Sequence, residues 1–366
     1  MDTGRGTGTG ATGAGTGAGT GAGGAPTLED VARAAGVSRA TVSRVVNGVR
    51  NVDPAIQQAV RQAVAATGYV ANRAARSLVT RRSGTVALVV SGAGPGSSGV
   101  RDEFAARVFE DPFFGRVVSG VVRALRPLGV HPVLMFADTG EDRAEVHAYL
   151  AQGSADGALL VTTHPRDPLP GMLAAAALPA VLFARPAAGV PLDHVDLRHR
   201  EGGALAARHL LALGRGRLAA IGGPADVPAS RERLAGFREA AEGRDRVVRV
   251  AEADFTFDGG ERAMSCLLAE RPDLDGVFAA NDLVAQGACL VLREHGRRIP
   301  EDVAVVGFDD SGAAAACRPR LTTVRQPVED MAAEMVRLLL DRIAGTAAPE
   351  PASVLFAPAL VIRDSA

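Results

Sequence analysis

Apolar runs that alternate with helical patterns most strongly constrain the fold of this chain of 366 residues. The runs are rich in Val, Ala and Leu, and each has the length of one strand. They lie at 86–90, 130–137, 157–162, 180–184, 217–223, 276–281 and 303–310. Strands that are apolar throughout are covered on both faces, so the runs predict parallel sheets with right-handed crossovers. The covering helices are predicted near 114–126, 141–151, 200–213, 229–241, 258–269, 282–295 and 328–343.

These runs form two successive series, and together they are too long for one ordinary core. We therefore expect an α/β core over 84–366, built from two doubly wound parallel-sheet lobes with a cleft between them. In sheets of this kind, ligands bind beyond the carboxyl ends of the strands. The core is thus expected to hold a small-molecule site between its lobes.

A different pattern lies before the core, at 27–49. Thr27 and Asp30 have the spacing of a capping box, and apolar residues at helical intervals follow them. Gly36 ends this first helix, because glycine readily adopts the positive φ of a helix exit. Ser38 is a good N-cap for a second short helix. The pattern predicts a helix-turn-helix.

The second helix presents a polar front that suits the major groove of DNA. The front consists of Arg39, Ala40, Thr41, Ser43, Arg44 and Asn47. Arginine can bond bidentately to guanine, and small hydroxyl side chains reach phosphates. An ordinary solvated helical hairpin would show the same two-helix pattern, so this pattern alone leaves both interpretations open.

A third helix is expected from Asp53-Pro54 to Gly68, which completes an all-α head over 26–70. Tyr69 follows it, and the Tyr69 hydroxyl could reach a phosphate. Residues 71–83 form a basic connector, either a short helix or an unstructured linker, in which Leu78 beside arginines could act as a minor-groove wedge. Residues 1–25 are Gly, Thr and Ala near-repeats and are expected to be disordered.

Charge is unevenly distributed along the chain. Residues 26–82 contain nine arginines and three acidic residues, a net charge of +6. The whole chain carries −1, so the remainder carries −7. A basic head on an acidic body indicates that the head alone binds nucleic acid.

Several other classes of protein are disfavoured. The three cysteines lie far apart without CxxC spacing, and the histidines lack metal-ligand spacing, so we expect no metal or cofactor and a reducing cytoplasm. No apolar stretch is long enough for a membrane helix, and no secretory signal is apparent. GxSxG, P-loop and HExxH motifs are absent, which disfavours an enzyme. A solute-binding protein would lack the basic head.

Polar and aromatic residues follow the predicted strands, where a cleft ligand would lie. They are Phe113, Phe114, Arg185, Arg233, Phe255, Asn281 and Asp309. Aromatic rings beside charged groups suit a small polar ligand. Each residue also has a structural alternative: Phe113 could belong to the core, Arg185 to a surface ion pair and Asp309 to a turn.

The ordered motifs resemble the lactose-repressor/galactose-repressor (LacI/GalR) family of transcription regulators from about Pro26 to Ser365. They are TLEDVARAAGVSRATVSRVVNG, GYVANRAARSL, DPFFGRVVSGV, RERLAGFREA, AANDLVAQGA, VAVVGFDD, LTTVRQP and LVIRDS. The resemblance implies a DNA-binding head, a hinge helix within 71–83, and a periplasmic-binding-protein-like core that binds an effector and dimerises.

The resemblance also assigns roles to individual positions. Arg39, Ala40 and Arg44 match base-reading positions, and Thr27, Ser38, Thr41, Ser43, Asn47 and Tyr69 match backbone-contacting or capping positions. Asn72, Arg73, Ala75 and Leu78 match the hinge, with Leu78 as its wedge. Phe113, Phe114, Arg233, Phe255, Asn281, Asp309 and, more weakly, Arg185 match the effector cleft.

The implied function is that of a repressor whose affinity for operator DNA depends on a small polar effector, a sugar or a related metabolite. A homodimer would bind a pseudo-palindromic site, and without a leucine-heptad tail no tetramer of that type is expected. Whether the effector releases or recruits DNA stays open. Arg198-His199 departs from the Asp-Asn that the family often has there, and this leaves an anionic or differently substituted effector open.

Overall fold

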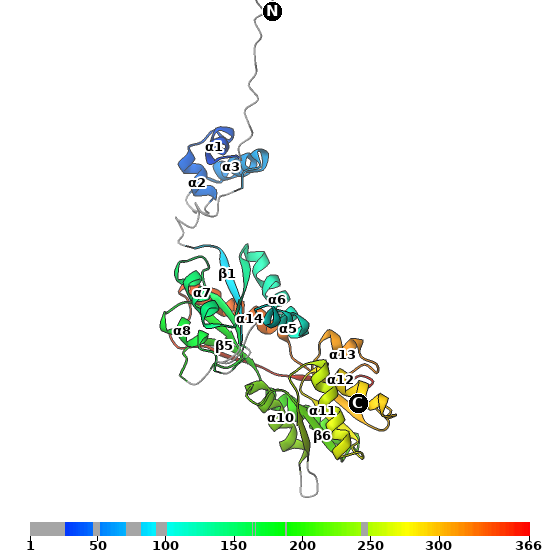
Figure 1. Cartoon of the computed structure of the whole chain (residues 1–366). Coiled ribbons are helices and arrows are strands. Elements are labelled where there is room, and N and C mark those ends of the chain that lie inside the picture. The colour runs from blue at the N-terminus through cyan, green and yellow to red at the C-terminus, as the bar shows by residue number, and fades with distance from the viewer. Residues whose placement is uncertain are drawn as a thin grey trace, which may run out of the picture. The chain divides into compact units, whose positions relative to one another are not determined.

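The computed structural model describes residues 26–46, 52–70, 82–92, 101–162, 164, 166–186, 189–242 and 248–366, with the side chains of 101–103 and 107 left aside. The chain separates into two compact units, Met1–Arg76 and Ser77–Ala366. Figure 1 shows both units.

The first unit contains three helices in its described part, α1 (Leu28–Ala35), α2 (Arg39–Val46) and α3 (Pro54–Thr67). Thr27 and Asp30 form the predicted capping box, and Gly36 ends α1 at a φ of 65°. Ser38 Oγ accepts a hydrogen bond of 3.2 Å from the Thr41 amide, as expected of an N-cap. These local signals thus confirm the predicted helix-turn-helix.

A small apolar core holds the three helices together. Val31, Val42 and Val60 are fully buried in it, one from each helix. Tyr69 is half-buried and packs against this cluster. Arg39 and Arg44 of α2 lie outside this core and are exposed.

The second unit consists of two lobes, each built on a sheet that has six strands among the described residues. The sheet of the first lobe has the order β11-β5-β4-β3-β1-β2, and that of the second has the order β12-β10-β9-β8-β6-β7. Strands of the first lobe are β1 (Thr85–Ser91), β2 (His131–Ala137), β3 (Ala158–Thr162), β4 (Ala180–Phe183), β5 (Asp193–Leu197) and β11 (Ser353–Phe356). Strands of the second lobe are β6 (Leu218–Gly222), β7 (Arg249–Glu252), β8 (Gly276–Ala279), β9 (Ala304–Asp309), β10 (Thr322–Arg325) and β12 (Ala359–Val361).

Helices cover both faces of each sheet. Those of the first lobe are α5 (Arg101–Glu110), α6 (Pro112–Leu125), η1 (Arg126–Leu128), α7 (Gly140–Ala151), α8 (Leu169–Ala175) and α14 (Val328–Ala344). Those of the second lobe are α9 (His199–Ala212), α10 (Pro228–Ala241), α11 (Phe257–Glu270), α12 (Asp282–Glu294) and α13 (Gly312–Ala316). Neighbouring strands are parallel except for the β10–β12 pair. The predicted pair of doubly wound lobes is confirmed.

The apolar runs did not predict β5, β7, β10, β11 or β12. In β5 the apolar pattern is interrupted by two carboxylates, Asp193 and Asp196. Asp193 can be buried because Arg342 neutralises its charge. The Nε and Nη2 of Arg342 donate to the Asp193 carboxylate at 2.6 and 2.7 Å. Asp196 lies 3.4 Å from His199. The strand is therefore stabilised by partners that the local sequence does not indicate.

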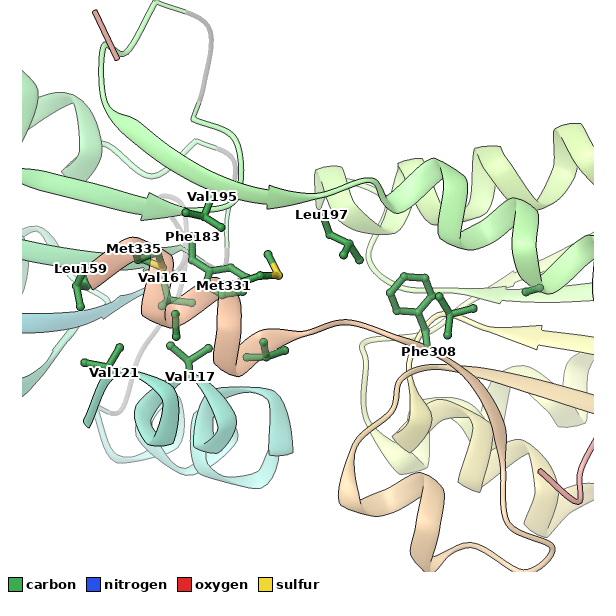
Figure 2. Packing of buried hydrophobic residues seen from close by; sticks show 14 of the residues in the cluster. Val117, Val121, Leu159, Val161, Phe183, Val195, Leu197, Phe308, Met331 and Met335 are labelled. Carbon is green, nitrogen blue, oxygen red and sulfur yellow. The ribbon is translucent and has the colours of Figure 1, made fainter. Parts of the chain in front are cut away.

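The chain crosses between the lobes three times in the described region, at 197–199, 325–328 and 356–359. One buried apolar cluster includes residues of both lobes and runs up to these crossovers (Figure 2). On the first-lobe side, Val117 and Val121 of α6 belong to it together with Met331 of α14. Leu197 and Phe308 are its members near the crossovers. This continuous packing places the ends of the two sheets opposite each other.

In the second lobe, α9 and α10 pack with their backbones in close contact. A Cβ on Gly203 would lie 1.9 Å from the Arg233 carbonyl oxygen, and a Cβ on Gly236 would lie 1.8 Å from the Arg200 carbonyl oxygen. Only glycine allows this approach. The close packing brings Arg233 of α10 next to His199 at the start of α9.

Candidate functional site

The predicted DNA-reading residues lie on and around α2. Arg39, Ala40 and Arg44 are exposed, while Thr41 and Ser43 are half-buried. The Arg39 Nε lies 2.9 Å from a carboxylate oxygen of Glu29, and both side chains stay mostly exposed. Such an exposed pair contributes little to stability, so the Arg39 side chain can exchange this partner for DNA.

The hydroxyls near the helix starts have local partners. Thr27 donates to Asp30 at 2.8 Å, and the hydroxyls of Ser38 and Thr41 lie 2.9 Å apart. Five predicted residues lie outside the described part of the chain: Asn47, Asn72, Arg73, Ala75 and Leu78.

The core contains a large cavity of about 1520 Å³, lined by residues of both lobes. All seven predicted effector residues line it, namely Phe113, Phe114, Arg185, Arg233, Phe255, Asn281 and Asp309. Most lie at the carboxyl ends of strands or the first turns of helices, as the topology requires. The cleft thus brings together residues that are far apart in the sequence.

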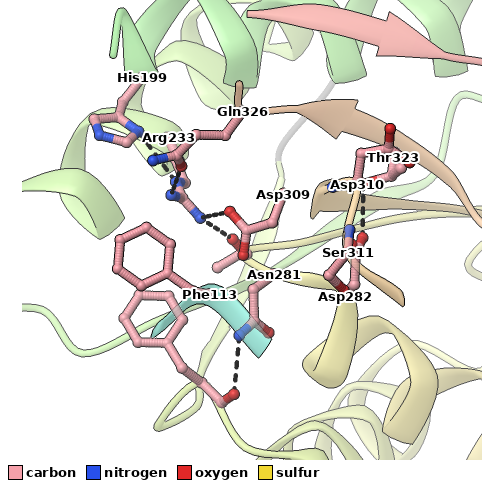
Figure 3. Close-up of polar contacts among 12 residues, drawn as sticks. Phe113, His199, Arg233, Asn281, Asp282, Asp309, Asp310, Ser311, Thr323 and Gln326 are labelled. Atoms are coloured by element: carbon pink, nitrogen blue, oxygen red, sulfur yellow. Dashed lines mark hydrogen bonds and ion pairs between the residues drawn. The ribbon is translucent and has the colours of Figure 1, made fainter. Parts of the chain in front are cut away.

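Aromatic rings form one part of the cavity wall. Phe113 contacts Phe114 and Phe183 edge-to-face, with ring centroids 5.2 Å apart in both pairs. Phe255 lines the cavity from the second lobe. The amide nitrogen of Asn281, labelled in Figure 3, donates to the Phe255 carbonyl oxygen at 2.9 Å. The amide oxygen of Asn281 accepts from the Val284 amide at the start of α12. Asn281 therefore positions Phe255 and caps a helix.

We call one group of polar residues that line the cavity the cleft floor: Asp111, Asp196, His199, Arg233, Asp309 and Gln326. Arg233 is only 6% exposed there. Its Nε donates to His199 Nδ1 at 3.2 Å, Nη1 to the Ala280 carbonyl at 2.7 Å, and Nη2 to Gln326 Oε1 at 3.1 Å (Figure 3). The guanidinium also lies 3.8 Å above the Phe308 ring. Each of its three nitrogens already has a protein partner.

His199 connects Arg233 to the acidic side of the floor. Because Nδ1 accepts from Arg233, the proton of the neutral ring is on Nε2, which faces Asp196 at 3.4 Å. Burial, supported by the charge of Arg233, lowers the pKa of His199. Burial opposes ionisation of Asp196 as well, but the hydrogen bond from His199 and the charge of Arg185 hold the pKa of Asp196 below its ordinary value. A neutral His199 and an ionised Asp196 follow.

Two further carboxylates face each other across the cleft. Asp111 caps α6 in the first lobe, and Asp309 ends β9 in the second lobe. Burial, followed by the charge of Asp309, raises the pKa of Asp111 to about 6. Asp309 Oδ1 is buried 3.3 Å from Arg233 Nη1 and has no hydrogen-bond partner among the described residues. Arg233 thus compensates the charge of Asp309, but Asp309 Oδ1 can still accept a hydrogen bond from a ligand.

Left-handed backbone conformations concentrate at this site. Ala184, Phe255 and Asp309 line the cavity with φ values of 86°, 65° and 100°. Non-glycine residues seldom adopt such angles, and they persist where the surroundings hold them in place. The site is thus held in a strained geometry, as binding sites often are.

Asp282 holds the loop that follows Asp309. Its Oδ2 accepts from the Ser311 amide at 2.7 Å, and its Oδ1 accepts from the Thr323 hydroxyl at 2.6 Å (Figure 3). Burial, followed by the charge of Asp309, raises the pKa of Asp282 to about 7.

We expect Asp282→Asn to change how stability depends on pH. In the parent protein, the unfolded state ionises Asp282 from about pH 4 whereas the folded state resists ionisation up to about pH 7, so stability is lost between these values. Asparagine keeps the shape and does not ionise. Urea unfolding at pH 5 and pH 7 should show that the free energy of unfolding of the variant rises relative to that of the parent as the pH increases. The same difference between variant and parent at both pH values would contradict the raised pKa of Asp282.

Several cleft residues were not predicted from the sequence, including Asp111, Asp196 and Gln326, and His199 was noted only as a departure from the family pattern. Asp111 has a signal, since Asp before Pro112 is typical of a helix start. Gln326 and Asp196 have none, because their positions depend on the crossovers. Among the described residues, no group of three or more His, Cys, Asp or Glu side chains could hold a metal.

Family models match both units of the chain. Residues 27–72 match "Bacterial regulatory proteins, lacI family", and residues 207–366 match a periplasmic binding protein-like domain. No helix in the described part of the chain has the length and apolar character to cross a membrane.

Characterised regulators are similar over nearly the whole chain. The HTH-type transcriptional regulator CelR of Thermobifida fusca is 46% identical over 346 residues, which cover 93% of this chain and 98% of CelR. The ribose operon repressor of Halalkalibacterium halodurans is 33% identical, covering 87% of this chain and 90% of the repressor.

Solved structures agree. A CelR–cellobiose complex matches with a TM-score of 0.69 and 43% identity, covering 93% of this chain and all 100% of that chain. The lac repressor dimer bound to operator and the anti-inducer ONPF matches with a TM-score of 0.73 and 26% identity, covering 93% and 98%. The chain therefore belongs to the lacI family of bacterial regulatory proteins, and it is a DNA-binding transcriptional regulator with an effector-binding core.

Proposed function

We propose that this protein is a sugar-responsive repressor whose cleft binds a neutral disaccharide or short oligosaccharide of the cellobiose type. The observation that carries this proposal is the excess of hydrogen-bond acceptors on the cleft floor. Asp309 Oδ1 lies 3.3 Å from Arg233 Nη1 but accepts no hydrogen bond from the residues that the structure describes, and Asp111 faces it from the other lobe. Sugar hydroxyls are donors that would satisfy both carboxylates.

An anionic effector fits this floor less well. Arg233, the buried cation, already donates from each of its three nitrogens to protein acceptors. Two arginines that line the cavity face acids: Arg185 lies 3.9 Å from Asp196, and Arg262 lies 3.1 Å from Asp254. Arg231, which also lines the cavity, donates to the carbonyl oxygens of Ala225 and Asp226. A phosphate or carboxylate would therefore meet cations that already have protein partners, with carboxylates nearby.

The size and walls of the cleft favour more than one sugar ring. Its volume of about 1520 Å³ exceeds the ~300–1,000 Å³ that is usual for small-ligand pockets. Phe113 and Phe255 offer aromatic surface from opposite lobes. The 46% identity to CelR, a structure of which contains cellobiose, supports the same class of ligand.

Isothermal titration of the full chain tests this proposal. Cellobiose and cellotriose should bind at least about tenfold more tightly than glucose 6-phosphate, gluconate or hypoxanthine, which is a difference of about 1.4 kcal/mol. Tight binding of an anion without binding of any neutral sugar would contradict the proposal. A sugar that binds but leaves the operator titration unchanged would contradict its role as effector.

DNA recognition is proposed to follow the family. A homodimer would place the two α2 helices in successive major grooves of a pseudo-palindromic site, with half-sites separated by about one helical turn. The head is proposed to span 26–70, the hinge 71–83 and the core 84–366. Binding of a chromosomal operator implies action in the cytoplasm, and we infer a binding rather than a catalytic role for the cleft.

Arg44→Ala is expected to weaken binding to the specific site by about 1–3 kcal/mol, because an arginine at a base-reading position contributes mainly to sequence discrimination. Fluorescence anisotropy on a duplex selected from a random pool, and on a scrambled duplex, measures both affinities. Arg33→Ala is the control, since Arg33 is 78% exposed on α1 and should affect both duplexes alike. If Arg44→Ala lowered the affinity for both duplexes equally, Arg44 would not read bases.

A further inference from the structure

Arg116, on α6 of the first lobe, contacts the backbone beneath the effector site. Its Nη1 donates to the Asp309 carbonyl oxygen at 2.7 Å, and its Nη2 donates to the Gln326 carbonyl oxygen at 2.9 Å. Asp309 ends a second-lobe strand, and Gln326 lies in a crossover between the lobes. One side chain of the first lobe is thus bonded to two residues of the cleft floor.

Both of these residues take part in the polar network of the floor. Asp309 lies beside Arg233, and the Gln326 side chain accepts a hydrogen bond from Arg233. Asp309 also holds a φ of 100°, so its backbone needs outside support to stay in this conformation. A ligand that moves the Asp309 carboxylate would move the carbonyl that Arg116 holds.

On its other side, Arg116 is attached to α14. Its Nε and Nη2 donate to the two carboxylate oxygens of Glu329, both at 2.7 Å, in a bidentate pair. Arg116 is 19% exposed and Glu329 32%, so water screens the pair only in part. A bidentate pair fixes the direction of the guanidinium as well as its position.

The two first-lobe helices that meet at Arg116 are closely packed. A Cβ on Gly120 of α6 would lie 2.8 Å from Ala332 Cβ and 3.0 Å from the Glu329 backbone of α14. Val117 of α6 and Met331 of α14 are buried in the same apolar cluster. A displacement of Arg116 would therefore shift α6 and α14 together rather than deform one of them.

We propose that Arg116 is a positioning residue that couples effector binding at Asp309 to the placement of the α6–α14 helix pair in the first lobe. This inference rests on the proposed function, because it takes Asp309 as an effector ligand. An ion pair that only stabilised the first lobe would need Glu329 alone. The two additional bonds, to carbonyls of the cleft floor, are what coupling requires.

Three variants of the full chain test this inference. Arg116→Gln removes the charge and the bidentate pair. Arg116→Lys keeps a charge near Glu329, but a single ammonium cannot span Glu329 and both carbonyls in the fixed directions of a guanidinium. Arg123→Gln is the matched control, because Arg123 lies about two turns further along α6, is 65% exposed and approaches Asp330 only to 3.9 Å.

The decisive quantity is the ratio of operator affinities measured with and without cellobiose. Parent and Arg123→Gln are expected to show a ratio of about 5–150-fold. In both Arg116 variants the ratio should fall below about twofold, while cellobiose affinity changes by less than about fivefold. If Arg116→Lys kept the parental ratio of operator affinities, the inference would be overturned. It would also be overturned if the cellobiose affinity fell by the same factor as that ratio.

Amide hydrogen exchange keeps the inference testable if no sugar binds and the proposed function fails. Arg116→Lys should then accelerate exchange at 309–311 and at the start of α14 by about tenfold, with Arg123→Gln unchanged. Unaltered exchange at both segments would overturn the positioning role. If Arg116→Gln does not fold, Arg116→Lys provides both measurements.

Discussion

Replacing Arg233 with methionine is expected to lower the free energy of unfolding by about 3–5 kcal/mol at pH 7, as removal of one partner from a buried ion pair does. Arg233 is 6% exposed and lies 3.3 Å from Asp309. Without it, Asp309 is an uncompensated buried carboxylate beside Asp111. His199 and Gln326 lose hydrogen bonds as well. Urea unfolding of the full core measures the change.

The pH dependence of this variant identifies the cause. The charge of Arg233 lowers the pKa of Asp111 in the parent protein, so without this cation the folded-state pKa of Asp111 should rise further, and acid should restore stability that is lost at neutral pH. The deficit relative to the parent should therefore shrink between pH 7 and pH 5. Arg262→Met is the control, since Arg262 forms an exposed pair with Asp254 and should change stability by less than about 1 kcal/mol. A deficit independent of pH would indicate lost packing.

Removing the Asp309 carboxylate is expected to weaken sugar binding by about 10–150-fold, the equivalent of the 1.5–3 kcal/mol that a charged hydrogen bond contributes. Asp309→Ala and Asp309→Gly should do so alike. The two variants should differ in stability, because alanine keeps a side chain at a φ of 100° and glycine does not. The free energy of unfolding of Asp309→Gly is expected to exceed that of Asp309→Ala by about 1 kcal/mol.

Titration calorimetry and urea unfolding separate these two effects. Asp258→Ala is the control, since Asp258 lines the same cavity but is exposed and should change sugar affinity little. If Asp309→Ala bound sugar as tightly as the parent, Asp309 would not contact the sugar. Equal stability of the alanine and glycine variants would show that the backbone relaxes without glycine.

One polar network serves both stability and coupling between the lobes. Arg233 organises the floor from within the second lobe, whereas Arg116 reaches the same floor from the first lobe. Loss of Arg233 should damage both stability and binding. Loss of Arg116 should mainly reduce the effect of sugar binding on operator affinity.

Local elements of this protein were predictable because their causes lie within a few residues. Thr27 with Asp30, and Gly36 after α1, determine where the first helix begins and ends. The apolar runs predicted most buried strands, since a strand covered on both faces needs no partner of a particular kind. β5 escaped this pattern because Asp193 depends on Arg342, which is 149 residues away in the chain.

The residues of the effector cleft were predictable as a set but not in their roles. The motifs placed Asn281 and Asp309 at strand ends and Arg233 in the helix after a strand, and all three line the cavity. The sequence alone could not show that Arg233 donates to protein acceptors, or that the Asn281 amide holds Phe255. Those roles depend on distances of a few ångströms between segments that lie tens of residues apart.

The order of apolar and polar residues along the chain determined the helical head, the two α/β lobes and the edge of the sheets where a ligand binds. Only the tertiary structure decided which groups on that edge are free to accept a hydrogen bond. It also decided that Arg116 joins the two lobes beneath Asp309. Hydrogen bonds and ion pairs act over about 3 Å, and such proximity between distant residues arises only when the lobes have packed.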